Sequence, residues 1–269
     1  MSEADKVFAG SIPALYDRYL GPLLFEPYAA DLAGRLATLT EGRLLETAAG
    51  TGIVTRALAT ALPGEVRIVG TDLNQPMVDH AATRFSSARV TWWQADALDL
   101  PFGNAAFDAV VCQFGVMFFP DKIKAYGEAR RVLKPGGRFV FNVWDRIEQN
   151  EFAQLVAGAV RDLFPRDPPM FLARTPYGHH DPRKIHDDLR QAGFAEVKCV
   201  TVANRSRAPS ARDPAIGFCQ GTPLRNEIEA RDAARLQEAT EAAAAAIAAK
   251  FGPGPVDGKI QAHVIVASG

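Results

Sequence analysis

Three acidic residues and a pair of glycines have the types and the spacing to bind a ligand. Glu46 comes shortly before Gly50 and Gly52. Glycine has no Cβ, so the backbone there can take a positive φ and a ligand can come close. Asp72 follows about 20 residues after the second glycine, where an acid can accept hydrogen bonds from the hydroxyl groups of a ribose. Together with Asp96 further along, this pattern predicts a nucleoside site.

The residues of the loop indicate which kind of nucleoside. A dinucleotide-binding loop carries three small residues in a fixed spacing, whereas the third position here is Thr55 in the frame that starts at Gly50. Glu46 precedes the loop, and its carboxylate would repel a pyrophosphate but attract a sulfonium or an ammonium group. The loop therefore favours a cationic adenosyl compound over a nucleotide phosphate.

Apolar runs broken by turn residues predict the elements that position this site. Residues 43–46, 53–62 and 67–72 predict a strand, a helix and a strand, which form one βαβ unit. Two helices, separated at Gly21-Pro22, are expected before it. Further strands are expected at residues 90–97, 107–114, 138–145, 196–203 and 260–267, and further helices at residues 76–85, 121–133, 150–164 and 182–192.

The ordered set of motifs resembles the class I S-adenosylmethionine (SAM)-dependent methyltransferases that act on small molecules, including those of ubiquinone and menaquinone biosynthesis. The similarity spans residues 44–144 and comprises the E-x-A-x-G-T-G run at 46–52, Asp72, Asp96 and the L-K-P-G-G run at 133–137. Ala48 departs from the family pattern, which has glycine there. The resemblance implies an α/β fold with a doubly wound, seven-stranded, Rossmann-like sheet whose last strand is antiparallel. It also implies SAM as the cofactor.

The resemblance also implies roles for individual residues. Leu73 or Met77 would pack on the adenine, Asp96 and the Ala97 N–H would bind the edge of the base, and the backbone at Gln113 and Phe114 would line the methionine half of SAM. A turn-capping role is the alternative for Asp96. The full set of expected cofactor-binding residues is Glu46, Thr47, Ala48, Gly50, Thr51, Gly52, Asp72, Leu73, Met77, Asp96, Ala97, Gln113 and Phe114.

The remaining segments predict how the chain is divided. Residues 1–40 are expected to form helices that act as a lid, residues 41–203 with 260–269 the SAM-binding core, and residues 204–259 a helical insertion. Within this insertion the alanine-rich run 226–250 predicts surface helices that line a cavity edge or a partner. The expected acceptor-pocket residues are Tyr16, Tyr19, Met117 and Tyr177, although aromatic side chains also serve as core.

No catalytic dyad is evident in the sequence. His179 and His180 are candidate proton acceptors, because imidazole titrates near neutral pH. A metal site is not expected, since adjacent residues point apart on regular elements and no third ligand has suitable spacing.

Composition limits the classes of partner and compartment. The formal net charge is −1 and the sequence has no block of lysine or arginine, so it predicts no basic surface for binding nucleic acid. Cys112, Cys199 and Cys219 are few and far apart, as in a reduced cytoplasmic protein. Neither an apolar leader in the first ten residues nor an apolar run long enough to span a membrane is present. We therefore expect a cytoplasmic enzyme with a small-molecule acceptor, and a homodimer stays open.

The expected reaction is transfer of the SAM methyl group to a small-molecule acceptor by in-line displacement. The alternatives are a nicotinamide-dependent oxidoreductase and a non-catalytic SAM-binding protein. Glu46 and Asp96 disfavour the oxidoreductase. The sequence Gln113-Phe114-Gly115-Val116 stands where methyltransferases that modify amino or base nitrogens of nucleic acid carry an N-P-P-Y-type tetrapeptide. O-, N- and C-methylation of a small molecule all stay open.

Overall fold

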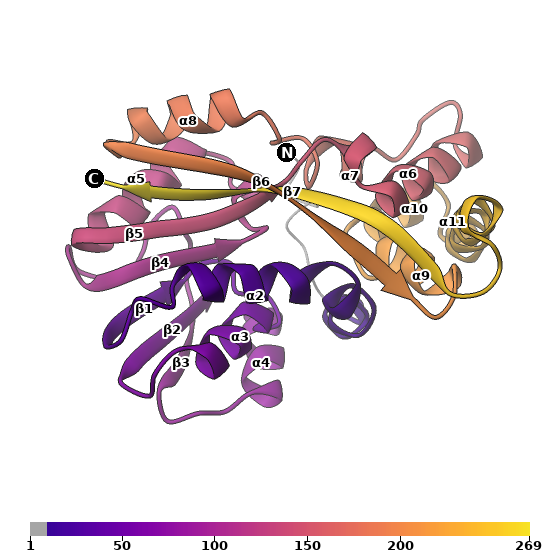
Figure 1. The fold of residues 1–269 in the computed structure, drawn as a ribbon. Helices are drawn as coiled ribbons and strands as arrows, with labels where there is room; N and C mark the ends of the chain where they lie inside the picture. The colour runs from indigo at the N-terminus through magenta and orange to yellow at the C-terminus, as the bar shows by residue number, and fades with distance from the viewer. Residues whose placement is uncertain (1–9) are drawn as a thin grey trace. The chain divides into compact units, whose positions relative to one another are not determined.

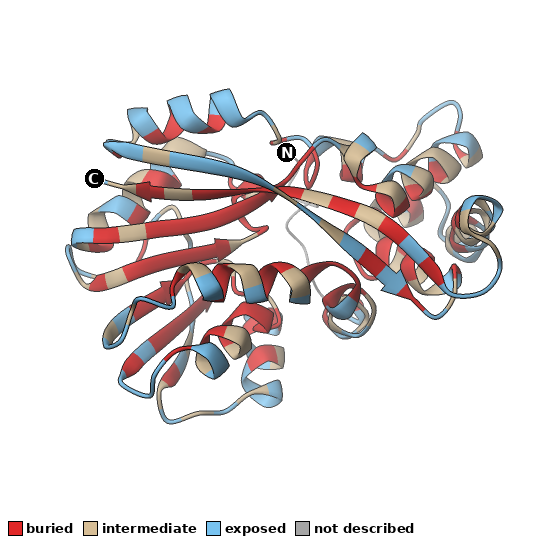
Figure 2. Cartoon of the chain, viewed as in Figure 1, coloured by how far each residue is buried: buried red, intermediate tan, exposed pale blue. Residues whose placement is uncertain are grey.

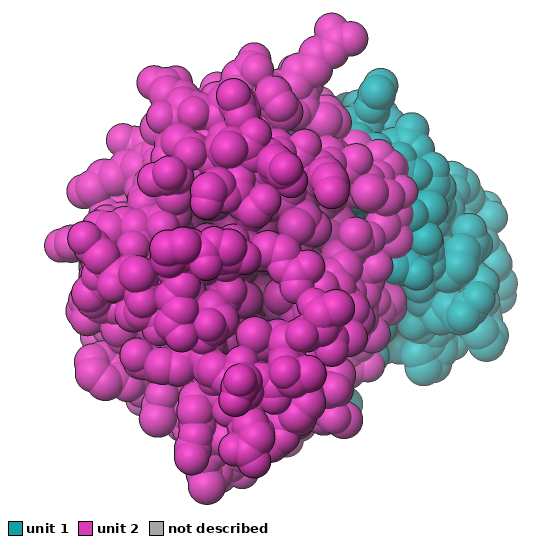
Figure 3. Space-filling model, turned by 60° about the vertical axis from the view of Figure 1, so that its left-hand side comes forward, with its two compact units in different colours: residues 1–25, 144–178, 203–262 teal, residues 26–143, 179–202, 263–269 magenta. Residues whose placement is uncertain are grey.

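The structure, a computed structural model, describes residues 10–269. The chain forms two compact units (Figure 3). Unit 1 holds residues 144–178 and 203–262 with the described part of residues 1–25, and unit 2 holds residues 26–143, 179–202 and 263–269. The first nine residues of the expected lid lie outside the described residues.

Unit 2 is built on a seven-stranded sheet (Figure 1) with the order β3-β2-β1-β4-β5-β7-β6. Strands β1 to β5 are parallel, and β7 lies antiparallel to both β5 and β6. This confirms the predicted fold class. The strands are β1 (Gly42–Glu46), β2 (Val66–Asp72), β3 (Val90–Gln94), β4 (Phe107–Gln113), β5 (Leu133–Trp144), β6 (Glu196–Ala208) and β7 (Val256–Ser268).

The central strands are apolar because helices cover both faces of the sheet. Helices α2, α3 and α4 lie on one face and α5 and α8 on the other, as right-handed crossovers that run in opposite directions from β1 require. Figure 2 shows β4 and β5 buried along most of their length. The helices of this unit are α2 (Glu26–Arg35), α3 (Ile53–Ala61), α4 (Gln75–Arg84), η3 (Val116–Phe118), α5 (Lys122–Val132) and α8 (Pro182–Gln191).

Unit 1 is mainly helical. Its helices are α1 (Ile12–Leu15), η2 (Tyr16–Phe25), η4 (Ile147–Gln149), α6 (Glu151–Leu163), α7 (Phe171–Arg174), α9 (Arg212–Gln220), α10 (Leu224–Asp232), η5 (Ala233–Arg235) and α11 (Leu236–Phe251). Residues 203–208 of β6 and 256–262 of β7 also belong to it.

The alanine-rich helix α11 is partly buried in unit 1, and its Ala246 also lines a pocket of that unit, as the expected role at a cavity edge requires. Helix α11 packs against α6 and α9, and Ala239, Ala243 and Ile247 are fully buried between them. Small side chains let helices approach closely, so a stripe with little apolar bulk still builds a core. Helix α11 therefore contributes a buried stripe to unit 1, whereas most residues of the run 226–250 are exposed or half-buried.

Several element boundaries differ from prediction. Strand β5 begins at Leu133, the last residue of the expected helix 121–133, rather than at residue 138. The helical turns do not stop at Gly21-Pro22, because η2 continues through both residues as a π-helix. Packing overrides the local break: Leu20 is buried, and a Cβ on Gly217 of α9 would lie 2.5 Å from Leu20 Cδ2. Strands β6 and β7 extend beyond their predicted ranges, and Arg205 and Asp257 pair across the extension, with Nε and Oδ1 2.7 Å apart. Among the described residues no helix is long and apolar enough to cross a membrane.

Candidate cofactor site

Two acids end neighbouring strands at the same edge of the sheet. Glu46 is the last residue of β1 and Asp72 the last of β2, and the two strands are parallel and directly paired. Both side chains are buried, with exposed fractions of 1% and 8%. Thr55 Oγ1 on α3 donates a hydrogen bond to Glu46 Oε2. Asp72 Oδ2 accepts from the Gly50 N–H at 2.9 Å, and its Oδ1 accepts from the Asn74 N–H at 2.9 Å.

Burial makes both acids hard to ionise. Burial raises the pKa of Glu46 to about 8; the hydrogen bond from Thr55 opposes this rise and the nearby Asp72 carboxylate adds to it. Burial also raises the pKa of Asp72, although the N–H groups of Asn74 and Gly50 oppose it. A cation placed beside these groups would favour their charged forms. The pair is therefore electrostatically suited to a positively charged ligand and unsuited to a phosphate.

The loop between β1 and α3 is held in a fixed shape. Ala48, Gly50 and Gly52 all have positive φ, at 52°, 55° and 78°. The Thr47 N–H donates to Val111 O at 2.9 Å, and the Ala49 N–H donates to Thr71 O at 2.8 Å. These bonds tie the loop to the strands on either side of β1. Ala48 adopts the left-handed conformation for which the family pattern supplies glycine.

Trp92 on β3 supports this loop, a role that sequence reasoning missed. A Cβ on Gly52 would lie 2.6 Å from Trp92 Cη2, and a Cβ on Gly70 would lie 2.6 Å from Trp92 Cζ3. The indole therefore fills the space that both glycines leave open, one at the start of α3 and one in β2. Gly70 and Trp92 are paired in the register of β2 and β3. This pairing joins residues far apart in the sequence, so no local sequence signal predicts it.

The turn after β4 lies against the same loop. Phe114 is buried and has a φ of 49°, which is unusual for a bulky side chain. Its N–H donates to Asn142 Oδ1 on β5 at 2.9 Å. A Cβ on the next residue, Gly115, would lie 2.5 Å from Ala48 Cβ, so the turn and the loop are in close contact.

The residues expected at the purine lie at the ends of β2 and β3. Leu73 is 45% exposed, whereas Met77 on α4 is buried. Asp96 is exposed, and its Oδ1 accepts a hydrogen bond from the Leu98 N–H at 2.9 Å. The turn-capping alternative for Asp96 is thus present, and a contact with adenine stays a prediction. All thirteen expected cofactor residues, from Glu46 to Phe114, belong to unit 2.

Comparison with known proteins identifies the family. A family model described as a methyltransferase domain matches residues 44–137. The ubiquinone/menaquinone biosynthesis C-methyltransferase of Burkholderia mallei is 32% identical over 167 residues, which cover 58% of this chain and 69% of that protein. The chain belongs to the SAM-dependent methyltransferase family. The resemblance inferred from the motifs is therefore confirmed.

Other relatives match this chain over shorter stretches. The demethylmenaquinone methyltransferase of Thermus thermophilus is 46% identical over 101 residues, which are 36% of this chain. The chain spans less than half the length of that protein (45%) and of a C-methyltransferase of ubiquinone/menaquinone biosynthesis from Geobacter (44%).

Solved structures share the fold at low sequence identity. The YcgJ protein of Bacillus subtilis has a TM-score of 0.58 and 21% identity, over 90% of this chain and 97% of that one. A Haemonchus contortus phosphoethanolamine N-methyltransferase, solved in complex with SAM, has a TM-score of 0.62 and 16% identity, over 100% of this chain and 60% of that one.

The two candidate proton acceptors lie directly before α8. His179 is buried, and its Nε2 lies 3.3 Å from Tyr126 Oη on α5. Burial, with Lys122 and Lys184 nearby, lowers the pKa of His179 to about 3, so the ring is neutral near pH 7. His180 is half-buried. Within residues 10–269 no group of three or more His, Cys, Asp or Glu side chains could hold a metal ion.

The residues expected at the acceptor fall in both units. Tyr16 stacks on Phe25 at a centroid distance of 4.7 Å, and Tyr177 packs against Trp144 at 5.9 Å, all within unit 1. Tyr19, under Arg18, belongs to unit 1 as well. Met117 is a buried residue of η3 in unit 2. A shared role for these side chains stays a prediction.

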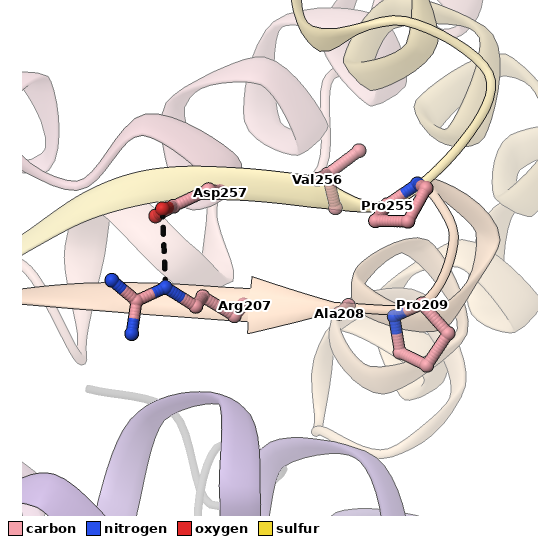
Figure 4. Close-up of a pocket in the computed structure, with 6 residues that line it drawn as sticks. All are labelled: Arg207, Ala208, Pro209, Pro255, Val256 and Asp257. Atoms are coloured by element: carbon pink, nitrogen blue, oxygen red, sulfur yellow. Dashed lines mark hydrogen bonds and ion pairs between the residues drawn. The ribbon is translucent and has the colours of Figure 1, made fainter.

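Unit 1 carries two further pockets that contain none of the expected site residues. One, of about 380 Å³, is lined by Arg207, Ala208, Pro209, Pro255, Val256 and Asp257 (Figure 4). Asp257 Oδ2 there pairs with Arg207 Nε at 3.1 Å. The other, of about 580 Å³, lies among α6, α7, α10 and α11. Asp257 also pairs with Arg205, so the one carboxylate at the first pocket is shared by two guanidinium groups.

Proposed function

We propose that this methyltransferase binds SAM at the carboxyl ends of β1 to β4 and transfers the methyl group to a small-molecule acceptor by in-line displacement. The observation that carries the proposal is the pair of buried acids, Glu46 and Asp72, beside a loop fixed at positive φ. Ligands of doubly wound sheets bind where the strand order reverses, which here is between β1 and β4.

The residues present fit an adenosyl sulfonium compound. Asp72 ends β2, where it can exchange an N–H partner for the hydroxyl groups of a ribose. Glu46 sits deeper beside the loop, where its charged form would be stabilised by a ligand cation. Thr55 holds the Glu46 carboxyl in place, so the acid does not need to reorganise when a ligand arrives.

SAM, when bound, supplies a methyl group already activated by a positively charged sulfur. The protein's task is therefore to hold the acceptor in line and to exclude water, and orientation of this kind can lower a barrier by about 7 kcal/mol or more. A general base is optional for an acceptor that is already nucleophilic. His179, neutral near pH 7 and beside Tyr126, is not needed as a proton acceptor in such a reaction.

The names of the relatives suggest the first acceptors to try. Two of them are named for carbon methylation in ubiquinone/menaquinone biosynthesis. We infer that an electron-rich ring carbon of a hydroquinone is the acceptor class to test first, with catechols and primary amines as the O- and N-acceptor controls.

Calorimetry and product analysis test the proposal. Wild-type protein should bind SAM and S-adenosylhomocysteine but not NAD. Asp72→Asn should lower the affinity for both adenosyl ligands by about tenfold or more, because a charge-assisted hydrogen bond is lost. Formation of S-adenosylhomocysteine with one acceptor class would establish transfer. Equal binding by wild type and Asp72→Asn would contradict the role of Asp72. Tight SAM binding without turnover on any acceptor would favour a non-catalytic SAM-binding protein.

A further inference from the structure

Asn142 is a lone amide in an otherwise apolar stretch of β5. Residues 139–144 are all buried, and Asn142 is fully buried among them. Its Oδ1 accepts the Phe114 N–H at 2.9 Å, and its main-chain O lies 3.3 Å from the same nitrogen. Its Nδ2 has no hydrogen-bond partner within residues 10–269.

This arrangement is a poor way to stabilise a sheet. A buried donor without an acceptor destabilises the folded state, whereas an apolar side chain of similar size would not. The Phe114 N–H also has a second acceptor, the main-chain O of Asn142, so it would not be orphaned if the side-chain amide were lost. Stability alone therefore does not account for Asn142.

The Asn142 side-chain amide holds the turn at Phe114 in an unfavourable backbone conformation. Phe114 has a φ of 49°, and such conformations persist only where surrounding contacts determine them. The Phe114 ring packs edge-on against Tyr28, with centroids 5.3 Å apart, and Tyr28 Oη is itself fixed by a 3.0 Å bond to Val202 O. The Asn142 amide fixes the backbone of this turn, as Tyr28 fixes its side chain.

The position of the turn indicates which part of a ligand it faces. In the order β3-β2-β1-β4, the acids at the ends of β2 and β3 lie on one side of the β1 loop and the Phe114 turn lies on the other. If Asp72 takes the ribose, as the proposed function holds, the nucleoside occupies the β2 side and the amino-acid half of SAM extends toward β4. The contact between Gly115 and Ala48 joins the turn to the loop.

We propose that Asn142 is a positioning residue that sets the β4 turn, residues 113–115, for the methionine half of SAM. This inference rests on the proposed function, because it assigns one half of the same ligand. Asn142 itself touches the turn and acts through it.

The test separates the two halves of the ligand. Asn142→Leu should lower the affinity for SAM and for S-adenosylhomocysteine by about tenfold, which corresponds to about 1.4 kcal/mol of binding free energy. Methylthioadenosine, which lacks the amino-acid group, should bind within about twofold of wild type, since its contacts lie on the β2 side. The melting temperature without ligand should stay unchanged or rise, because the buried donor is gone. Asn142→Asp, which keeps an acceptor for the Phe114 N–H, should restore most of the SAM affinity.

Controls keep the outcomes distinct. Val140→Ala, two residues earlier on the same face of β5, should lower the melting temperature and leave SAM affinity intact. Asn142→Ala serves in place of Asn142→Leu if the leucine side chain prevents folding, with the same expectation for the ligands. Wild-type affinity for SAM in the folded Asn142 variants, or equal losses for SAM and methylthioadenosine, would overturn this inference. Absence of SAM binding by wild type would instead overturn the proposed function.

Discussion

The buried carboxyl of Glu46 makes folding stability depend on pH in a direction opposite to most acids. An exposed glutamate ionises near 4.5, whereas Glu46 in the folded protein ionises near 8. Between these values the unfolded chain binds fewer protons than the folded one, so the free energy of unfolding falls as pH rises. At about 1.4 kcal/mol per pKa unit, the difference between 4.5 and about 8 is worth at most about 5 kcal/mol.

Glu46→Gln removes this titration and keeps a carbonyl oxygen for the Thr55 hydroxyl. The variant and wild type should therefore have similar stability near pH 4.5, and the variant should become progressively more stable toward pH 8. With about 2 °C of melting temperature per kcal/mol, the gap should widen by up to about 10 °C. Glu65→Gln, an exposed acid of the same unit, is the matched control and should follow wild type throughout.

The same carboxyl couples ligand binding to protons. A cation beside Glu46 favours its charged form, so SAM binding by wild type near pH 7 should release close to one proton, and affinity should rise with pH up to about 8. Calorimetry in two buffers of different ionisation enthalpy counts the protons. Melting curves that run parallel for wild type and Glu46→Gln from pH 4.5 to 8.5, together with equal proton release, would refute this account of Glu46.

Three further predictions concern contacts around the site. Gly115→Ala should lower the free energy of unfolding by about 1–3 kcal/mol and weaken SAM binding, because the added Cβ would lie 2.5 Å from Ala48 Cβ. The second substitution Ala48→Gly should recover part of both losses, as measured by denaturant titration and calorimetry. Gly70→Ala should likewise lower the free energy of unfolding by about 1–3 kcal/mol. Trp92→Leu should cost much less stability in the Gly70→Ala variant than in wild type. Additive losses of stability in this double-mutant cycle would exclude the contact between the two residues. His179→Asn should lose less stability than wild type when pH is lowered from 7 to 5, since the folded pKa of His179, about 3, lies below the ordinary value of 6.5 and the unfolded chain then binds the extra proton; identical acid profiles would contradict it.

Local sequence signals predicted the elements that carry the motifs. Glu46 and Asp72 end their strands as expected, because apolar runs closed by a glycine turn or an acid leave little choice of structure. The family motifs added the order and direction of the strands. The strand ends rest on residues that act on their neighbours in sequence, whereas the order and direction of the strands rest on the resemblance.

Contacts between distant segments could not be predicted in this way. Asn142 on β5 accepts a hydrogen bond from Phe114, which follows the neighbouring strand β4. Trp92 fills space left by Gly52 and Gly70, which lie on other elements. A polar residue in an apolar run is the one signal that could have drawn attention to Asn142. The π-helix through Gly21-Pro22 depends likewise on packing against another helix, which local propensity does not encode.

The interleaved course of the chain limits how this protein can be taken apart. Each unit is assembled from three separate stretches, and the boundaries at residues 202–203 and 262–263 fall in the middle of β6 and β7. A single cut therefore cannot liberate the helical part as an autonomous module. Transplanting it onto another protein would require cutting and rejoining the chain at five boundaries, two of them inside β6 and β7, so this unit is more readily altered by point substitution than by exchange of whole segments.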